Sequence, residues 1–504
     1  MFAMLLFLSM IYMGWKIVNW VWIRPKKIEK QLRAQGLAGN PYRLLYGDTN
    51  DMAAMISRAK SNPIKLSDDI VPRVLPLHHH VINKYGKASF IWIGPVARVL
   101  IMEPELIKQI LINNHIFKKP THNPLAKFLV CGLSGYEDQK WAKHRRIITP
   151  AFYVEKLKHM VPAMHTSCCE MIKKWEKLVV EEKKGIEIDV QPYLEDLTSE
   201  IIARTAFGSR HEEGRRIFEL QKEQSELTRQ VLQSVYIPGW RYIPTKRNRR
   251  MKEINNQVCR QLRGMIKKRE ESMKRGESAD DDLLGILLKC NEREEGGMSI
   301  EEVVEECKTF YLSGQESTSN LLSWTMLMLS LHPTWQQQAR DEIFRVFGDA
   351  RPHFHGLNRL KVVTMILYEV LRLYPPAIIF NRIVEKETEV GEMSLPGGVH
   401  VLLPIILIHH DKELWGQDAQ QFKPQRFSEG IAKATKNRLS FFPFSWGPRL
   451  CIGNNFALME AKMALAMILP RFTFKLSPSY AHAPSFVVSL QPQHGIHLTL
   501  IHKP

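Results

Sequence analysis

Cys451 has the surroundings in this chain that most strongly suggest chemistry. It lies in the stretch FSWGPRLCIG, just before a predicted helix from Asn455 to Pro470. The dipole and free N–H groups at a helix N-terminus stabilise a thiolate and lower the pKa of the thiol. Gly447 and Gly453 allow close approach of the backbone to the sulfur, and Phe444 can shield it. A buried structural cysteine is the alternative, but the complete match to F-x-x-G-x-R-x-C-x-G favours a thiolate that binds a metal in a dry site.

A second motif, WAKHRR, places Trp141 and Arg145 four residues apart, on one face of a predicted helix. Arg145 and Arg449 are permanently charged groups that suit carboxylates on a bound cofactor. The motif is weak by itself, and it gains meaning only beside the cysteine loop.

Glu369 and Arg372 lie three residues apart in YEVLRLYPP, so they share a helix face and can pair. The same spacing occurs elsewhere in the chain, where a solvated face explains it. Here the surrounding residues are apolar, so both charges are predicted to be buried and must be compensated. Arg426 in FKPQRF supplies a third charge, and we interpret the three as a structural ion network under the cofactor.

A fourth motif lies in the middle of a long predicted helix. Ser299 caps this helix with Glu302 in a capping box, and His332–Pro333 ends it after Leu331. Gly314 and three polar groups lie where burial makes them costly. Their hydroxyls can bond to the carbonyl four residues earlier and bend the helix. An acid and an alcohol beside bound oxygen could relay protons to it, which suggests catalytic roles for Glu316, Ser317 and Thr318. A kinked helix with its polar face toward water is the alternative.

The first 23 residues are predicted to be a membrane anchor. Residues 2–23 are apolar except for Ser9, Lys16 and Asn19, and as a helix they would span about 33 Å, close to the ~30 Å hydrocarbon core. Tryptophans gather toward the C-terminal end, as at a membrane interface. A basic linker at residues 24–45 predicts the cytoplasmic side for the rest. A cleaved signal peptide is disfavoured, because the n-region lacks charge and no A-x-A site follows.

Residues 46–504 are predicted to form one mainly α domain with small β-sheets. Residues 89–102 form a hairpin pattern around Gly94–Pro95, and residues 397–408 form a strand-like run. Residues 270–297 are charged and are predicted to connect two helices in solvent. Three adjacent histidines, residues 78–80, cannot face one point on a helix, so we interpret them as a surface feature.

Composition excludes several classes of protein. Seven cysteines, odd in number and widely spaced, do not form a disulfide scaffold or a zinc ribbon. The formal charge of +18 favours acidic partners, an anionic membrane surface among them. Nucleic acid is not expected as a partner, because no nucleic-acid-binding motif accompanies the charge.

The motifs occur along the chain in the order W-x-x-x-R, G-x-E-S-T, E-x-x-R and F-x-x-G-x-R-x-C-x-G. With its N-terminal anchor, the chain resembles a microsomal cytochrome P450 over essentially all of residues 24–504. The resemblance implies the P450 fold and haem b, iron protoporphyrin IX, with Cys451 as the axial iron ligand. It implies propionate-binding roles for Trp141, Arg145, Arg382 and Arg449, and an oxygen-activating acid–alcohol pair of Glu316 and Ser317.

Two motifs depart from the usual family pattern. Ser313 and Ser317 replace the usual Ala and Thr of the mid-helix motif. Serine keeps the hydroxyl, so we expect retained activity with more uncoupling. Gln425 replaces the usual Glu before Arg426, and because Arg426 is present we expect the ion network to persist.

The resemblance implies a monooxygenase that inserts one oxygen atom from O2 into a C–H bond of a hydrophobic substrate. NADPH would supply electrons through NADPH–cytochrome P450 reductase, whose acidic domain suits the basic surface. Residues 24–48 and 66–77 resemble plant enzymes similar to secologanin synthase, a subfamily that oxidises iridoids, triterpenoids and gibberellins. The family pattern places the substrate pocket among the 120s, Thr309–Ser313, Ala377–Phe380 and Ser485–Leu490.

The predicted location is the endoplasmic reticulum membrane, with one membrane pass, contact with lipid and a cytoplasmic catalytic domain. Two other functions remain open. A haem-thiolate isomerase or dehydratase would need neither O2 nor a reductase, and the acid–alcohol pair argues against it. A non-catalytic haem- or sterol-binding membrane protein would not need that pair either.

Overall fold

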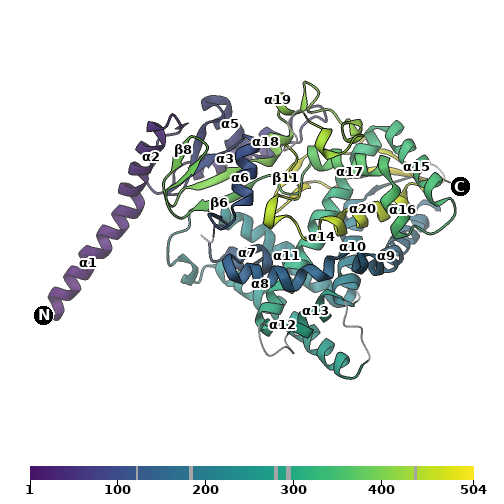
Figure 1. Cartoon of the computed structure of the whole chain (residues 1–504), viewed down its shortest axis with the longest axis horizontal. Helices are drawn as coiled ribbons and strands as arrows, with labels where there is room; N and C mark the ends of the chain where they lie inside the picture. Colours follow the sequence, from purple (N-terminus) through teal and green to yellow (C-terminus); the bar gives the residue numbers. More distant parts are fainter. Residues whose placement is uncertain are drawn as a thin grey trace.

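Helices make up most of the computed structural model, and the strands it describes form four separate sheets. The model describes residues 1–120, 123–180, 185–209, 211–276, 282–290, 297–435 and 440–503. Figure 1 shows the helical mass with α1 projecting from it, far from the C-terminus. This architecture confirms the predicted mainly α class with small sheets and one apolar N-terminal helix.

The α-helices are bounded as follows: α1 (Phe2–Val18), α2 (Arg24–Ala34), α3 (Thr49–Lys60), α4 (Val71–Val74), α5 (Pro76–Tyr85), α6 (Pro104–Ile112), α7 (Gly132–Gly135), α8 (Asp138–Ile148), α9 (Val154–Val180), α10 (Gln191–Phe207), α11 (His211–Leu232), α12 (Lys246–Lys274), α13 (Leu283–Lys289), α14 (Ile300–Leu331), α15 (Pro333–Phe347), α16 (Phe354–Arg359), α17 (Lys361–Leu373), α18 (Ile405–His409), α19 (Lys412–Trp415) and α20 (Asn454–Ile468).

The largest sheet has the strand order β1-β2-β3-β9-β6-β4, and the smaller sheets are β10-β13-β5, β11-β12 and β7-β8. The strands are β1 (Ala38–Gly39), β2 (Ser89–Ile93), β3 (Val96–Leu100), β4 (Phe117–Lys118), β5 (Ile186–Asp189), β6 (Phe380–Val384), β7 (Thr388–Val390), β8 (Met393–Leu395), β9 (His400–Leu403), β10 (Phe472–Leu476), β11 (Pro484–Phe486), β12 (Leu490–Pro492) and β13 (His497–His502).

The long helix α14 runs through the helical core with the predicted bounds. Ser299 Oγ accepts a hydrogen bond from the Glu302 N–H, and the Glu302 side chain accepts one from the Ser299 N–H, which completes the capping box. Most of its residues before Ser313 and after Ser317 are buried. The helix packs against α10, α12, α17 and α20, so it is the element on which the other helices of the core converge.

The N-terminal helix continues beyond the predicted anchor. A π-helical segment, η1 (Asn19–Ile23), joins α1 to α2 without a break. No residue of α1 is buried, whereas Ile28 and Leu32 of α2 are buried against the large sheet. The first part of the predicted linker is therefore a helix that packs on the domain, because its apolar residues recur on one face.

The two strand patterns have different outcomes. Residues 89–102 form the predicted hairpin, in which β2 and β3 pair around Gly94, a residue with φ +57°. The run at 397–408 is a strand only in β9 and then turns at Pro404 into α18. Proline cannot donate to the ladder, so the apolar run changes structure there without losing its burial.

The charged connection at 270–297 is described only in part, since residues 277–281 and 291–296 lie outside the described ranges. Its apolar centre is helix α13, whose leucines are buried in the main core. The hydrophobic cores divide accordingly: one large cluster joins the helices, and a second joins α2 and α6 to the six-stranded sheet.

Candidate functional site

The cysteine loop folds as its glycine spacing predicts. The Cys451 N–H donates to the Phe444 carbonyl at 2.9 Å, which closes the loop before α20. Gly447 has φ +68°, and a Cβ there would lie 2.9 Å from the Leu111 carbonyl oxygen. Glycine is needed at this position for both reasons. Gly453 is the N-cap of α20, so the helix begins at Asn454, three residues after the cysteine.

Cys451 is exposed in the structure although protein atoms surround it closely. Its side chain is accessible, yet burial raises the pKa of its thiol, and the Gly453 N–H, Arg145 and Lys119 lower that pKa only in part. The helix N-terminus therefore does not make a thiolate unaided, contrary to the sequence-based expectation. Desolvation outweighs the local dipoles, and a bound metal cation would supply the missing positive charge.

The middle of α14 is accessible from within the core as well. Ser313 is exposed and Gly314, Glu316 and Ser317 are partly exposed, although the helix on either side is buried. Helix α20, which follows the cysteine loop, packs against α14. The cysteine loop and the mid-helix motif are thus both accessible, and they lie on or next to two helices that pack together.

The mid-helix hydroxyls bond as predicted. Ser313 Oγ donates to the Thr309 carbonyl at 2.7 Å, and Ser317 Oγ donates to the Ser313 carbonyl at 2.8 Å. A Cβ on Gly314 would lie 2.6 Å from Ile202 Cγ1 of α10. The glycine permits close packing of two helices.

Glu316 is held from outside its own helix. Ser489, between β11 and β12, donates from Oγ to Glu316 Oε1 at 2.6 Å, and Asn320 Nδ2 donates to Ser489 Oγ at 2.9 Å. Burial raises the pKa of Glu316, and the hydrogen bonds from Ser489 lower it in part. The carboxyl is therefore positioned to exchange a proton nearer neutral pH than an exposed glutamate.

Thr318 points elsewhere. It is buried, and its hydroxyl is the polar group that partly lowers the pKa of Glu460 in α20. Burial nevertheless raises the pKa of Glu460 well above the ordinary carboxyl value. Thr318 thus joins α14 to α20, and of the three predicted catalytic residues only Glu316 and Ser317 are partly exposed.

Cations gather around the cysteine loop. Burial, with Arg382 and Arg449 nearby, lowers the pKa of Lys119 to about 7, and burial beside Arg449 lowers the pKa of Arg382 to about 10. Arg145 Nη1 donates to the Leu450 carbonyl at 3.0 Å. Glu137 lies 2.7 Å from Arg449 Nη2, and Asp138 also acts on the charge of Arg449. Positive charge exceeds negative charge in the cluster.

The predicted WAKHRR helix is α8, and its side chains contact both the cysteine loop and α14. Trp141 lies under Arg449, with the guanidinium carbon 4.1 Å from the ring centroid. His144 Nδ1 lies 2.6 Å from Glu306 Oε1 of α14, and both side chains are fully buried. This buried pair ties Trp141 and Arg145 to the long helix.

The structure brings the predicted ion network together. Arg372 Nη2 lies 2.7 Å from Glu369 Oε1, and Arg426 Nε lies 3.4 Å from the same oxygen. Arg372 also donates to the His409 carbonyl at 2.8 Å. The carboxylate of Glu369 and the guanidinium groups of Arg372 and Arg426 together hold α17 to the segment before the cysteine loop.

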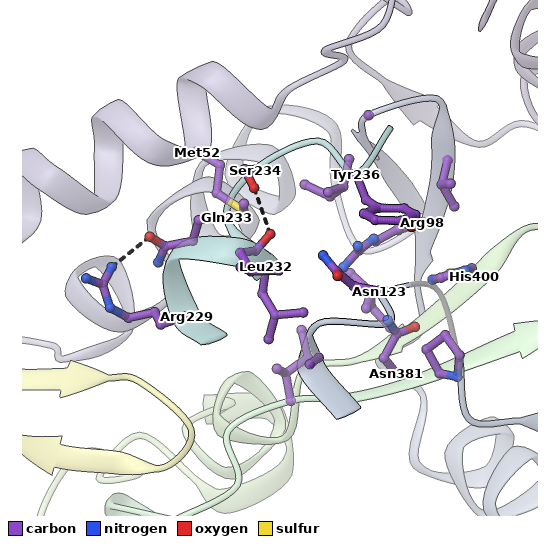
Figure 2. A pocket seen from close by; sticks show the side chains of 18 of the residues that line it. Met52, Arg98, Asn123, Arg229, Leu232, Gln233, Ser234, Tyr236, Asn381 and His400 are labelled. Carbon is purple, nitrogen blue, oxygen red and sulfur yellow. Dashed lines mark hydrogen bonds between the residues drawn. The ribbon is translucent and has the colours of Figure 1, made fainter. Parts of the chain in front are cut away.

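A cavity of about 680 Å³ opens beside the N-terminal helix (Figure 2). Trp20 of η1 lines it, as do residues of α3, the β2–β3 hairpin and the loop after α11. Part of the predicted lining is present, while Thr121 and His122 lie outside the described residues. The residues present are Pro120, Asn123, Ala126, Lys127, Ile379, Phe486 and Val487.

Thr309–Ser313 are not among the residues that line this cavity, and their place in the substrate pocket stays a prediction. Helix α7 lies between, since Cys131 and Gly135 line the cavity while a Cβ on Gly132 would lie 2.5 Å from Thr309 Oγ1. The prediction that the histidines at 78–80 are a surface feature is wrong for His78. This residue is buried and lines the cavity. Its apolar neighbours in α5 carry it inward. Among the described residues, no group of His, Cys, Asp and Glu is placed to hold a metal ion.

Comparison with known proteins decides the family. The family model for cytochrome P450 matches residues 74–499. The chain belongs to the cytochrome P450 family. It is 56% identical over 498 residues to cytochrome P450 CYP72A219 of Panax ginseng, covering 97% of this chain and 96% of that protein. It is 50% identical over 507 residues to secologanin synthase 1 of Catharanthus roseus, covering 98% and 96%. This P450 is therefore a monooxygenase of the secologanin synthase-like subfamily.

Membership implies haem, a redox partner and a hydrophobic substrate, and the residues present fit haem. The accessible Cys451 would supply the thiolate ligand that P450 haem iron takes. The surplus of cations over Glu137 matches a group that carries two carboxylates.

Sequence analysis missed several residues of this site, chiefly Lys119, Glu137, His144, Ser489 and Glu460. Each acts through a partner far along the chain, as Ser489 does with Glu316. The doublet of lysines before Pro120 and the histidine inside WAKHRR were available as signals.

Proposed function

We propose that this P450 is an anchored endoplasmic reticulum enzyme that hydroxylates a hydrophobic plant terpenoid, such as an iridoid, a triterpenoid or a gibberellin. NADPH–cytochrome P450 reductase would supply electrons from NADPH, and the catalytic domain would face the cytoplasm. One observation carries the proposal: an accessible cysteine loop and an accessible acid–alcohol pair lie on adjoining buried elements, α20 and α14.

Haem b, when bound through Cys451, would supply the oxygen-activating chemistry. The residues of the chain would do the rest. Arg145, Arg382 and Arg449 would bind its propionates, assisted by Lys119. Phe444 and Gly447 would shape the sulfur side, and Gly453 would donate its N–H toward the sulfur.

Glu316 would move protons, since its carboxyl is partly accessible and its pKa is raised by burial. Ser317 would pass them on through its hydroxyl, which now donates to the Ser313 carbonyl at 2.8 Å and must rotate to do so. The Glu369, Arg372 and Arg426 network would act only structurally.

The cavity supports a hydrophobic substrate that enters from lipid. Most of its lining is apolar, and Trp20 places one edge beside the helix that can cross a membrane. The basic chain, with a charge of +18, suits both an anionic membrane surface and an acidic reductase domain.

The test is the product mass formed by membranes that hold this protein and a plant reductase, with NADPH and O2. The substrates would span iridoid glucosides, oleanane triterpenoids, gibberellins and fatty acids. We expect a product one oxygen atom heavier from a single terpenoid class, and no product from the Cys451→Ser variant, whose reduced, CO-bound spectrum should lose its thiolate character.

Conversion without NADPH would support an isomerase or dehydratase instead. An intact thiolate spectrum without product or NADPH consumption, across the whole set of substrates, would support a binding protein. Either result would contradict the proposal.

A further inference from the structure

Arg98 lies where the large sheet forms one wall of the cavity. Its Cα pairs with that of His400 in the parallel β3–β9 ladder, so the two side chains share a sheet face. Asn381 of β6 pairs with Leu402, which places it on the same face. All three side chains line the cavity, and Figure 2 shows Arg98 and Asn123 directed into it.

Arg98 has no counter-charge. Within the part of the chain that the structure describes, no Asp or Glu lines the cavity. The guanidinium forms no ion pair with any described residue, and its buried Nε has no hydrogen-bond partner among them. Burial lowers the pKa of Arg98 to about 10, so the group remains cationic at neutral pH.

The other arginines of the cavity are already engaged. Arg229 Nε donates to Glu226 Oε2 at 2.9 Å. Arg73 Nε donates to the Pro484 carbonyl at 2.9 Å, and its Nη2 donates to Gln493 Oε1 at 2.8 Å. Arg73 and Arg229 therefore have partners for their guanidinium groups, whereas the Nε of Arg98 has none among the described residues.

The neighbours of Arg98 are polar without being acidic. Burial and the charge of Arg98 lower the pKa of His78 to about 4, so His78 is neutral and offers no opposing or competing charge at neutral pH. Asn381 Oδ1 is buried and has no hydrogen-bond partner among the described residues. A cation left unpaired in a mostly apolar wall is costly unless a ligand supplies the anion.

We propose that Arg98 binds the carboxylate of the substrate, so that this P450 selects a hydrophobic acid over the corresponding neutral ester. The inference rests on the proposed monooxygenase function and narrows its substrate class. A carboxylate suits the site because a guanidinium can bind both of its oxygens, while apolar walls receive the hydrocarbon body. Asn381 would position the acid by its amide group.

Binding to the purified, haem-loaded full chain in lipid nanodiscs tests this inference. The probes are three acids with their methyl esters: hexadecanoic acid, an oleanane acid and a gibberellin. Each is titrated by the spin-state change of the haem spectrum and by equilibrium dialysis, which needs no spectral change. We expect at least one acid to bind about 10- to 100-fold more tightly than its ester, the range for a hydrogen bond to a charged group.

Variants locate the effect. Arg98→Met should abolish the preference and leave the affinity for the ester unchanged, while Arg98→Lys should keep part of the preference. Arg229→Met is the matched control, because it removes a cavity arginine that already has a carboxylate partner, and it should leave the preference intact. If Arg98→Met does not fold, as judged by the reduced, CO-bound spectrum, Arg98→Gln replaces it.

Equal affinity for acid and ester in all three pairs, or a preference that survives in Arg98→Met, would overturn the inference. Failure of the proposed function is seen separately, as loss of the thiolate spectrum or of NADPH-dependent product in the unmodified chain. A normal spectrum with no acid preference would therefore refute the role of Arg98 alone.

Discussion

Glu460 is a residue whose ionisation the fold opposes. Because burial raises its pKa well above the usual value, the folded state holds a proton that the unfolded state releases above about pH 4.5. The unfolded state then binds fewer protons, so stability falls as pH rises, by at most ~1.4 kcal/mol per pH unit for one group. We predict that Glu460→Gln raises the thermal midpoint relative to the parent, and that this difference grows between pH 5 and pH 8.

Circular dichroism melts across that pH range measure the difference. Glu429→Gln is the control, since Glu429 is exposed beside Lys433 and should give no pH-dependent difference. A Glu460→Gln effect that is the same at pH 5 and pH 8 would show that Glu460 is not protonated in the folded protein.

Single residues were predictable where spacing alone defines their chemistry. Cys451 and the Glu369–Arg372 pair are local patterns, and the structure places them as their patterns predict. Lys119 and Ser489 could not be found this way, because each gains its meaning from a partner on another element. The raised pKa of Cys451 has the same origin, since desolvation comes from the whole fold.

The β11–β12 hairpin and α14 are the pair of elements that couple the cavity to the acid–alcohol motif. Phe486 and Val487 line the cavity, while Ser489 bonds to Glu316. We predict that Ser489→Ala raises the pKa of Glu316 further and frees its side chain. Losing a hydrogen bond to a charged group costs ~1.5–3 kcal/mol, so product formation should fall about tenfold or more while haem content is unchanged.

The measurements are the fraction of consumed NADPH recovered as product, the peroxide formed, and the dependence of that fraction on pH. The pH profile should shift upward with the pKa of Glu316, which a purely structural effect would not cause. Ser485→Ala, in the same hairpin, is the matched control and should couple normally. An unshifted profile in Ser489→Ala would remove Ser489 from proton delivery.

Elements were predictable where a start signal and a stop signal bound a periodic pattern. The capping box and His332–Pro333 bound α14, and both limits are confirmed. The run at 397–408 and the linker at 24–45 were harder, because a short apolar run suits strand and helix alike. Tertiary packing decided both, through Pro404 in one and the buried face of α2 in the other.

At the scale of the whole molecule, the N-terminal helix divides into a part that touches the domain and a part that does not. The continuous helix Phe2–Ala34 is the one described helix long and apolar enough to cross a membrane. Its first section, α1, is exposed throughout, whereas Tyr42 donates from its hydroxyl to the Val21 carbonyl at 2.6 Å and α2 is partly buried. Membrane attachment and domain stability should therefore be separable along one helix.

Two truncations test this separation. Removing residues 2–18 deletes no buried side chain, so we expect an unchanged thermal midpoint and thiolate spectrum with much less protein in the membrane fraction. Removing residues 2–34 also takes Ile28 and Leu32 from the sheet core, at ~1.5–3 kcal/mol each, and should lower the midpoint by several degrees. Because Trp20 lines the cavity, only the longer truncation alters its wall. A shared loss of stability in both truncations would mean that α1 contributes to the fold, and the anchor would then not be an independent element.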